Sequence, residues 1–439
     1  MTLTTQTAPL TDAPQPDFVA EAAALFPGGG IGPSDATLRT LYPAMIHRAE
    51  GPWLHTSEGE KLLDFVMGGS ALILGHGDAH VAAAVAEQVG RGTHYYQILH
   101  EPALRFAAKL VETIPVAEKL IYTSTGSDAV QQAVRLARAK TGRPGVLKFT
   151  GAYHGTNDVA LVGMSSPQGR NAGQADAGGI DPAGLGNVFA VARDDLARVE
   201  TLLRLEGDRI ACVLIDPLQR WLKPDPAFLT GLRALCDQYG VLLVFDEVVT
   251  GFRLSLGGAQ ALWNVTPDIA AYGKIIGGGL PLGAVVGPAE IMDMADARSR
   301  EAGTAVATSG TFNANVLACT AGLATVERLC TPGLYEGLAE KGAALRHEMQ
   351  AILDQNGIAA VVGGEASFWH VTFGDHEPTT YEDNLGMDLE RARALDRALL
   401  TNGIFVMPNG RRSLSVAHGP EEIAYFLSVF DDICKKKAF

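Results

Sequence analysis

The 439-residue sequence lacks the features that mark membrane-spanning and nucleic-acid-binding proteins. No apolar run reaches the roughly 18 residues that a helix needs to cross a bilayer. Lysine and arginine together number 35, against 49 aspartate and glutamate residues, so the formal net charge is −14. Phosphate backbones and anionic headgroups attract clustered positive charge. We therefore expect no nucleic acid and no membrane among the partners.

Targeting segments and a disulfide pattern are also missing. Residues 1–16 hold no lysine or arginine and no apolar stretch, so they match neither a secretory signal nor a transit peptide. We interpret them as a disordered leader. The five cysteines are odd in number and widely spaced, which favours free intracellular thiols over a disulfide framework or a zinc site. These absences predict a cytoplasmic protein.

Two other cofactor classes find little support in the sequence. No G-x-G-x-x-G follows a predicted strand, as a dinucleotide-binding fold would require. His76 and His80 have the i, i+4 spacing of a metal pair, but no glutamate lies between them and no third ligand is apparent. We therefore expect neither a nicotinamide cofactor nor a metal.

The most informative stretch contains two short apolar runs, and each leads to a residue with a chemical role. Val241 to Phe245 are five apolar residues in a row, as in a strand buried on both faces of a parallel sheet, and Asp246 follows them. A second run, Ile269 to Tyr272, leads to Lys274. Ligands bind beyond the carboxyl ends of such strands, so we expect both side chains at the edge of a site.

An acid and a lysine in these positions suit pyridoxal phosphate (PLP) chemistry. Lys274 would hold the cofactor as a Schiff base and move protons at the substrate carbon. Asp246 would pair with the pyridine nitrogen and keep it protonated, so that the ring accepts electrons from the substrate. On this stretch alone, a helix-capping aspartate and a solvated lysine stay an open alternative.

A phosphate-binding turn is predicted upstream of that stretch. The strand candidate at residues 119–123 is followed by Thr125, Gly126 and Ser127, and then by a helix over about residues 129–140. Backbone N–H groups, hydroxyls and the positive end of the helix dipole would face an anion there. An ordinary serine or aspartate N-cap would give a similar pattern.

Five separated motifs resemble, in the same order, the class III (subgroup II) PLP-dependent aminotransferases, in particular their glutamate-1-semialdehyde 2,1-aminomutase-like branch. The strongest are DEVVTGFR, which contains Asp246, and GKIIGGGLPLGA, which contains Lys274. A weaker likeness extends from about Phe26 to Ile433.

The resemblance implies an α/β protein of PLP fold type I. Such a protein has a large domain with a mostly parallel, doubly wound sheet, and a smaller α+β domain assembled from both chain ends. We expect residues 71–332 to form the large PLP-binding domain. Residues 17–70 would join the C-terminal small domain, residues 333–439, with the boundary near Pro332.

The resemblance also assigns contacts to the cofactor. In the block from Gly151 to Gly155, Tyr153 would stack on one face of the pyridine ring, and His154 is a further cofactor-binding candidate. Val248 would pack against the opposite face. Thr311, in a block similar to GTFxxNP, would reach the phosphate of the partner subunit's cofactor. A homodimer with sites at the interface follows from this last contact.

Arginines are the expected partners of the substrate. A carboxylate-bearing amino acid or oxo acid is bound bidentately by a guanidinium group. The candidates are Arg39, near the family's N-terminal substrate loop, and Arg411 and Arg412 near the C-terminus. A solvated surface position is the alternative interpretation of each.

The type of reaction stays open between two readings that share every cofactor motif. One is transamination between an amino acid or amine and a carbonyl acceptor; the other is the intramolecular shift of glutamate-1-semialdehyde aminomutase. Residues 32–39 depart from the mutase's Ser-Pro-Val-Arg, residues 409–412 lack its acidic gate, and Asp216 stands where a glutamate is common. The GKIIGGG motif and the pair Ala417-His418 resemble the mutase sequences. On these motifs we favour transamination and keep aminomutation as the alternative.

Overall fold

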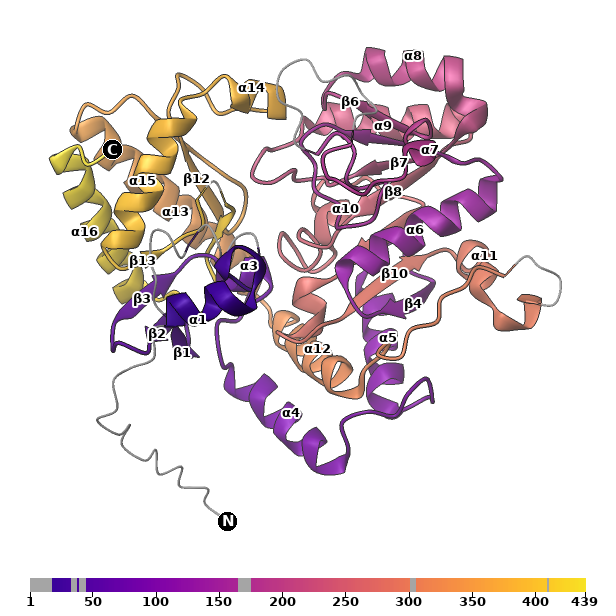
Figure 1. Cartoon of the computed structure of the whole chain (residues 1–439), viewed down its shortest axis with the longest axis horizontal. Coiled ribbons are helices and arrows are strands. Elements are labelled where there is room, and N and C mark those ends of the chain that lie inside the picture. Colours follow the sequence, from indigo (N-terminus) through magenta and orange to yellow (C-terminus); the bar gives the residue numbers. More distant parts are fainter. Residues whose placement is uncertain (1–17, 33–37, 39–44, 165–174, 301–304, 409) are drawn as a thin grey trace.

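A seven-stranded sheet forms the centre of the larger part of the molecule (Figure 1). The computed structural model describes residues 18–32, 38, 45–164, 175–300, 305–408 and 410–439. The sheet has the strand order β4-β10-β9-β8-β7-β5-β6. The strands are β4 (Lys119–Thr123), β5 (Gly145–Phe149), β6 (Val188–Val191), β7 (Ile210–Ile215), β8 (Leu242–Asp246), β9 (Ile269–Tyr272) and β10 (Gly283–Gly287). All neighbours are parallel except β10, which runs antiparallel to both β4 and β9.

Successive residues of the central strands face two different layers of helices. In β8, Leu243 and Phe245 belong to the core that also contains side chains of α5, α9 and α12. Val244, between them, packs in the core built on α6. Burial on both faces explains why the strands read as continuous apolar runs. The helices of this part are α4 (Ala79–Arg91), α5 (Glu101–Thr113), α6 (Gly126–Thr141), α7 (Pro182–Leu185), α8 (Leu196–Glu206), α9 (Pro226–Tyr239), α10 (Gly258–Leu262), α11 (Ala289–Met292) and α12 (Val316–Leu329).

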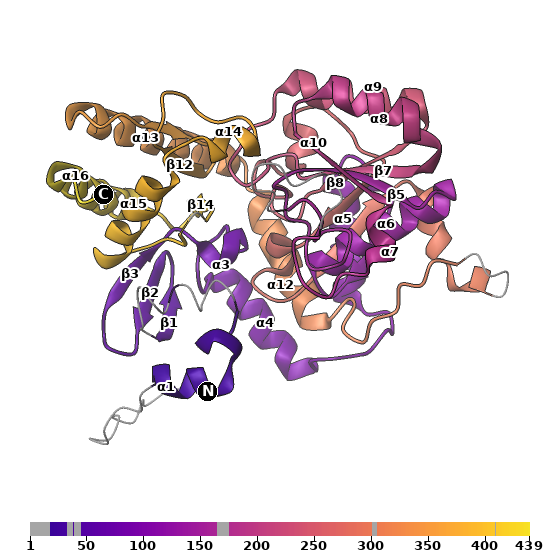
Figure 2. The same ribbon diagram turned by 45° about the horizontal axis from the view of Figure 1, so that its top comes forward.

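The smaller part combines both ends of the chain (Figure 2). Strands β1 (Ile46–Glu50), β2 (Trp53–Thr56) and β3 (Lys61–Asp64) are antiparallel, and β13 (Ile404–Phe405) joins them by pairing parallel to β3. A second sheet contains β11 (Val361–Gly363), β12 (Phe368–Thr372) and β14 (Arg412–Ser413). The helices here are α1 (Phe18–Leu25), α3 (Met67–Ser70), α13 (Leu334–Gln355), α14 (Tyr381–Leu385), α15 (Leu389–Thr401) and α16 (Pro420–Lys436).

The observed architecture is the predicted one, a large, mostly parallel sheet with a smaller α+β part built from both ends. Residue 332, our proposed domain boundary, lies in the turn between α12 and α13. The predicted leader falls outside the described residues. Within the described ranges, no helix is both long enough and apolar enough to span a bilayer.

Candidate active site

Asp246 and Lys274 lie at the carboxyl ends of two neighbouring parallel strands. Asp246 is the last residue of β8 and pairs in register with Ala271 of β9. Lys274 opens a 3₁₀ turn just after β9 and has a positive φ of 51°. The pKa of Lys274 is lowered from 10.5 to about 8, mainly by burial and also by the positive charge of Arg411, against the opposing effect of Asp246 and Asp216. The fold therefore places a lysine that loses its proton readily beside a carboxylate.

Both carboxylate oxygens of Asp246 are engaged by neighbours from two loops. Its Oδ2 lies 2.7 Å from Nδ1 of His154, and its Oδ1 accepts a hydrogen bond of 3.1 Å from the backbone N–H of Val248. Asp246 and His154 are both buried. The second ring nitrogen of His154, Nε2, is buried without a hydrogen-bond partner among the described residues. The carboxylate is thus held in one orientation and shielded from water.

The N-terminus of α6 comes close to the loops that carry Val248 and His154 because glycines stand at the contacts. A Cβ on Gly126 would lie 2.7 Å from Cγ1 of Val248, and one on Gly155 would lie 2.4 Å from Oγ of Ser127. Thr125 caps the helix by accepting a hydrogen bond from the N–H of Asp128. The first amides of a helix have no partner within the helix and attract anions. The predicted phosphate-binding turn therefore lies next to Asp246.

These segments enclose a pocket of about 200 Å³. Most of the predicted cofactor and catalytic residues line it, and one predicted substrate arginine does so too. The lining residues are Thr125, Gly126, Ser127, Val130, Tyr153, His154, Gly155, Asp216, Asp246, Val248, Val249, Lys274 and Arg411. Tyr153 is half exposed at this pocket.

Arg411 reaches the pocket from the C-terminal part of the chain. Its Nη2 donates to Oδ2 of Asp216 at 2.7 Å and its Nε donates to the carbonyl of Arg220 at 2.6 Å. Burial raises the pKa of Asp216, whereas the charge of Arg411 lowers it. The other oxygen of Asp216, Oδ1, has no hydrogen-bond partner among the described residues.

The other predicted site residues lie elsewhere. Arg412 is wrong as a substrate residue, because its guanidinium is buried against Asp396 and 2.7 Å from Nδ1 of His370. Arg411 directly precedes β14 and lines the pocket, whereas Arg412 lies within β14 and does not. Thr311 is exposed in a turn and does not line the pocket of its own chain. Arg39 lies outside the described residues.

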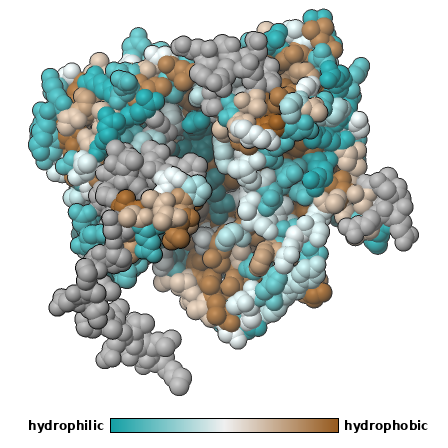
Figure 3. Space-filling model, viewed as in Figure 1, coloured by the Kyte–Doolittle hydropathy of each residue, from teal (hydrophilic) through white to brown (hydrophobic). Residues whose placement is uncertain are grey.

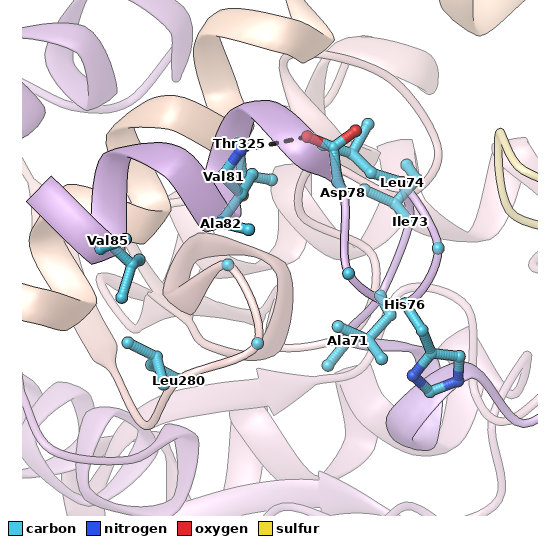
Figure 4. A pocket seen from close by; sticks show the side chains of 16 residues that line it. Ala71, Ile73, Leu74, His76, Asp78, Val81, Ala82, Val85, Leu280 and Thr325 are labelled. Carbon is cyan, nitrogen blue, oxygen red and sulfur yellow. Dashed lines mark hydrogen bonds between the residues drawn. The ribbon is translucent and has the colours of Figure 1, made fainter. Parts of the chain in front are cut away.

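A separate hollow of about 440 Å³ lies between α4 and the turn after Lys274 (Figure 4). Val81 and Val85 of α4 and Leu280 form apolar walls, and His76 lines it while pairing with Asp64 at 2.7 Å. It shares no lining residue with the Lys274 pocket. No group of three or more metal-binding side chains occurs in the part of the chain that the structure describes.

The Lys274 pocket has the groups that PLP needs. The start of α6, with the Ser127 hydroxyl, would hold the phosphate, and Asp246 would face the pyridine nitrogen. The buried, unpartnered atoms Nε2 of His154 and Oδ1 of Asp216 are free to bond a polar ligand. Val248 and Tyr153 both line the pocket and would contact the ring of the cofactor. Fold and site together define a PLP-dependent enzyme of fold type I.

The chain belongs to the class-III aminotransferase family, whose model matches residues 36–419. It is 36% identical over 410 residues to the glutamate-1-semialdehyde 2,1-aminomutase of Hyperthermus butylicus, covering 92% of this chain and 94% of the relative. Identity to the protein of the same name from Methanopyrus kandleri is 37% over 397 residues, or 89% and 90% of the two chains. A solved omega-transaminase from Sphaerobacter thermophilus is 34% identical with a TM-score of 0.89, over 96% and 97% of the two chains. The predicted family, branch and cofactor are confirmed.

Sequence reasoning missed how Asp216 and Arg220 surround Arg411. Asp216 follows the fully buried strand β7, just as Asp246 ends β8, so its position at the same sheet edge was a usable signal. Arg220, four residues further on, has no comparable signal, because its role depends on a carbonyl oriented by a positive φ of 58°.

Proposed function

We propose that this chain moves an amino group on a small substrate that carries a carboxylate. The observation that supports this most directly is that Arg411 and Lys274 line the same pocket. The guanidinium would bind the substrate carboxylate. Lys274, whose pKa is about 8, would be neutral in an appreciable fraction of molecules near pH 8 and would take and return a proton at the substrate carbon.

The remaining residues would position these two groups. PLP supplies an electron sink when it is bound. Asp246, fixed by His154 and the amide of Val248, would provide a negative charge at one end of the pocket. Tyr153 and Val248 would restrict the plane in which a ring lies.

For the reaction itself, we propose the conversion of glutamate-1-semialdehyde by an intramolecular amino shift as the first candidate. Our motif analysis favoured transamination, but the curated relatives with 36% and 37% identity both carry the aminomutase name and match about nine-tenths of the chain. They support the alternative interpretation better than the one we preferred.

Intermolecular transamination is the second candidate, and a specific observation favours it. The omega-transaminase structure matches this chain over 96% of its length at 34% identity. In addition, Asp216 holds Arg411 in the pocket at the place where the sequence departs from the mutase pattern. We keep both candidates because they use the same cofactor residues.

A single experiment separates the two reactions. Purified enzyme is given glutamate-1-semialdehyde without a second substrate, and 5-aminolevulinate is measured. In parallel, a panel of amino donors is supplied with pyruvate or 2-oxoglutarate, and the new amino acid is measured. Rapid aminolevulinate formation without net transfer supports the mutase, whereas transfer without aminolevulinate rejects it.

Replacing Arg411 with glutamine should raise KM for carboxylate-bearing substrates. A hydrogen bond to a charged group contributes about 1.5–3 kcal/mol, which corresponds to an increase of about tenfold to a hundredfold. Arg393→Gln is the matched control, because Arg393 is exposed on α15 of the same part of the molecule. Steady-state kinetics measure both variants. Unchanged KM in Arg411→Gln for every acidic substrate would reject the assignment.

We also propose a homodimer with sites at the interface. Large apolar side chains are exposed in the segment before and within α5 and at the turn near Thr311; they are Tyr96, Ile98, Leu99, Leu104, Val111 and Phe312. Several of them line a surface hollow together with Thr308 and Asn313. Helix α4, where apolar atoms gather in Figure 3, has Gln88 as its only buried residue. Apolar surfaces of this kind mark interfaces.

The double substitution Ile98→Glu with Leu99→Glu should convert a dimer into a monomer. Two buried charges without partners oppose association strongly. Light scattering should give the mass of two chains for the wild type and of one chain for the variant, and activity should fall in parallel. Leu205→Glu is the control, since Leu205 is 65% exposed on α8. A monomeric wild type with full activity would contradict the proposal.

A further inference from the structure

Helix α14 extends from the smaller part of the molecule toward the larger part (Figures 1 and 2). Its first residue, Tyr381, lies on the loop that carries Tyr153 and His154. A Cβ on Gly151 would stand 2.2 Å from Cγ of the Tyr381 ring, so glycine is needed there for the ring to sit against the backbone. Gly151 also has a positive φ of 77°, which favours glycine independently.

Two polar contacts fix α14 and the residues before it on this loop. The hydroxyl of Thr150 donates to Glu382 of α14. The guanidinium of Arg193, which is buried, donates to the carbonyl of Thr379 and also to the carbonyls of Leu222 and Lys223 at 2.9 and 2.8 Å. The chain is therefore held by polar contacts both before and after Tyr381.

Arg220 connects the Tyr381 ring to the pocket. Its guanidinium carbon lies 5.6 Å from the centre of the Tyr381 ring, and its Nε donates to the carbonyl of Gly151 at 3.2 Å. The backbone carbonyl of the same residue accepts the 2.6 Å hydrogen bond from Nε of Arg411. A continuous set of contacts thus runs from Tyr381 through Arg220 to Arg411.

We infer that Tyr381 is a positioning residue that sets the place of the Arg411 guanidinium in the pocket by holding Arg220. The inference deepens the proposed function, since it rests on Arg411 as the group that binds the substrate carboxylate. Tyr381 does not line the pocket itself, so it acts only through Arg220.

The physical reason lies in the backbone of Arg220. This residue has φ of 58°, a left-handed conformation that costs energy for a side chain other than glycine and persists only when its surroundings hold it. The aromatic face of Tyr381 and the carbonyl of Gly151 hold its side chain. Without the ring, Arg220 is free to relax, and its carbonyl turns away from Arg411.

Two variants of Tyr381, with phenylalanine and with leucine, distinguish the displacement of Arg411 from a loss of folding. Tyr381→Phe keeps the aromatic ring that faces Arg220, so this variant serves as the matched control. Tyr381→Leu keeps an apolar side chain but removes the aromatic ring that contacts Arg220. Both are prepared as PLP-loaded enzyme, and the visible absorption and melting temperature are compared with those of the wild type.

Two measurements test the inference. Calorimetry with glutarate, a carboxylate that cannot be transaminated, should show weaker binding by about threefold to thirtyfold in Tyr381→Leu and no change in Tyr381→Phe. In an Arg411→Gln background, Tyr381→Leu should cause no additional loss, because both changes remove the same contact. Crystal structures should show the Arg411 guanidinium displaced from Asp216 in Tyr381→Leu and unmoved in Tyr381→Phe.

The outcomes distinguish the inference from the proposed function. If Arg411 keeps its contacts with Asp216 and Arg220 in the Tyr381→Leu crystal, the inference is overturned, whatever the affinity. If Arg411 moves in that crystal but Arg411→Gln binds glutarate as the wild type does, Tyr381 positions Arg411 and the carboxylate role of Arg411 is wrong.

Discussion

Replacing Lys274 with alanine should remove the visible absorption of the purified enzyme and nearly all of its activity. The expected decrease in kcat is about 10²- to 10⁴-fold, because the only lysine that lines the described pocket is then missing as a proton carrier. The wild type should be yellow, and its absorption should shift toward the near-ultraviolet when an amino donor is added. Absorption spectra and steady-state kinetics of both proteins measure this.

Lys148 provides the control for that experiment. It is also buried, and burial lowers its pKa to about 8, but its Nζ donates to the carbonyl of Ala160 and does not line the pocket. Lys148→Met should therefore keep the visible absorption in every molecule that folds, with folding measured by circular dichroism. Normal turnover in Lys274→Ala, or loss of the absorption only in folded Lys148→Met, would show that the wrong lysine was assigned.

The pKa of Lys274 also predicts a pH dependence. An ordinary lysine becomes neutral only as the pH rises through about 10.5, whereas Lys274 does so through about 8. In cofactor-free enzyme, the rate of reaction with PLP at low concentration should rise through about pH 8 and then level off. A rate that keeps rising to pH 10 would mean that the amine is not buried as the structure shows.

The positions of Asp246 and Lys274 could be predicted from the sequence because each lies at the carboxyl end of a buried strand. The continuous apolar runs identify the strands, and the ends of parallel strands bring such residues together without any knowledge of the rest of the chain. The strand, turn and helix around Gly126 could be predicted for the same reason, since they are consecutive in the sequence.

Residues that reach the pocket from a distance could not be predicted in this way. Nothing local in the sequence separates Arg411 from Arg412. In the structure, Arg412 pairs with Trp369 of β12, whereas Arg411, just before β14, lines the pocket. The contacts of Tyr381 with Arg220 join positions 161 residues apart. Such arrangements follow from the docking of the two parts of the molecule, which the order of local motifs does not specify.

The type of reaction was the property that the sequence predicted least well, for a related reason. PLP enzymes that transfer an amino group between two substrates and those that move it within one substrate use the same strand-end lysine and aspartate. The strongest motifs therefore do not distinguish the two reactions. The segments that differ between the two readings are residues 32–39, Asp216 and residues 409–412, and most of the first segment falls outside the described residues. Enzyme kinetics, rather than further inspection of the cofactor residues, will decide between them.

Replacing Asp246 with asparagine should lower kcat strongly and leave the fold intact. Asparagine has nearly the same shape, and its Oδ1 can still accept the hydrogen bond from the amide of Val248. The negative charge is lost, however, and the pocket then contains only Asp216 to balance Lys274 and Arg411. Removing one such electrostatic contact in an active site costs about 10²- to 10³-fold in kcat.

The neighbouring residue Glu247 supplies a control with the opposite expectation. It is fully buried and accepts hydrogen bonds from the hydroxyl of Thr250 and from the amides of Ala259 and Gln260, but it does not line the pocket. Glu247→Gln should therefore lower the free energy of unfolding by about 1–3 kcal/mol and leave kcat per folded molecule unchanged. Asp246→Asn should show the reverse pattern: an unchanged melting temperature and a reduced kcat. If the two variants lose stability and activity in the same proportion, Asp246 has a structural role like that of Glu247, and its assignment to the pyridine nitrogen must be withdrawn.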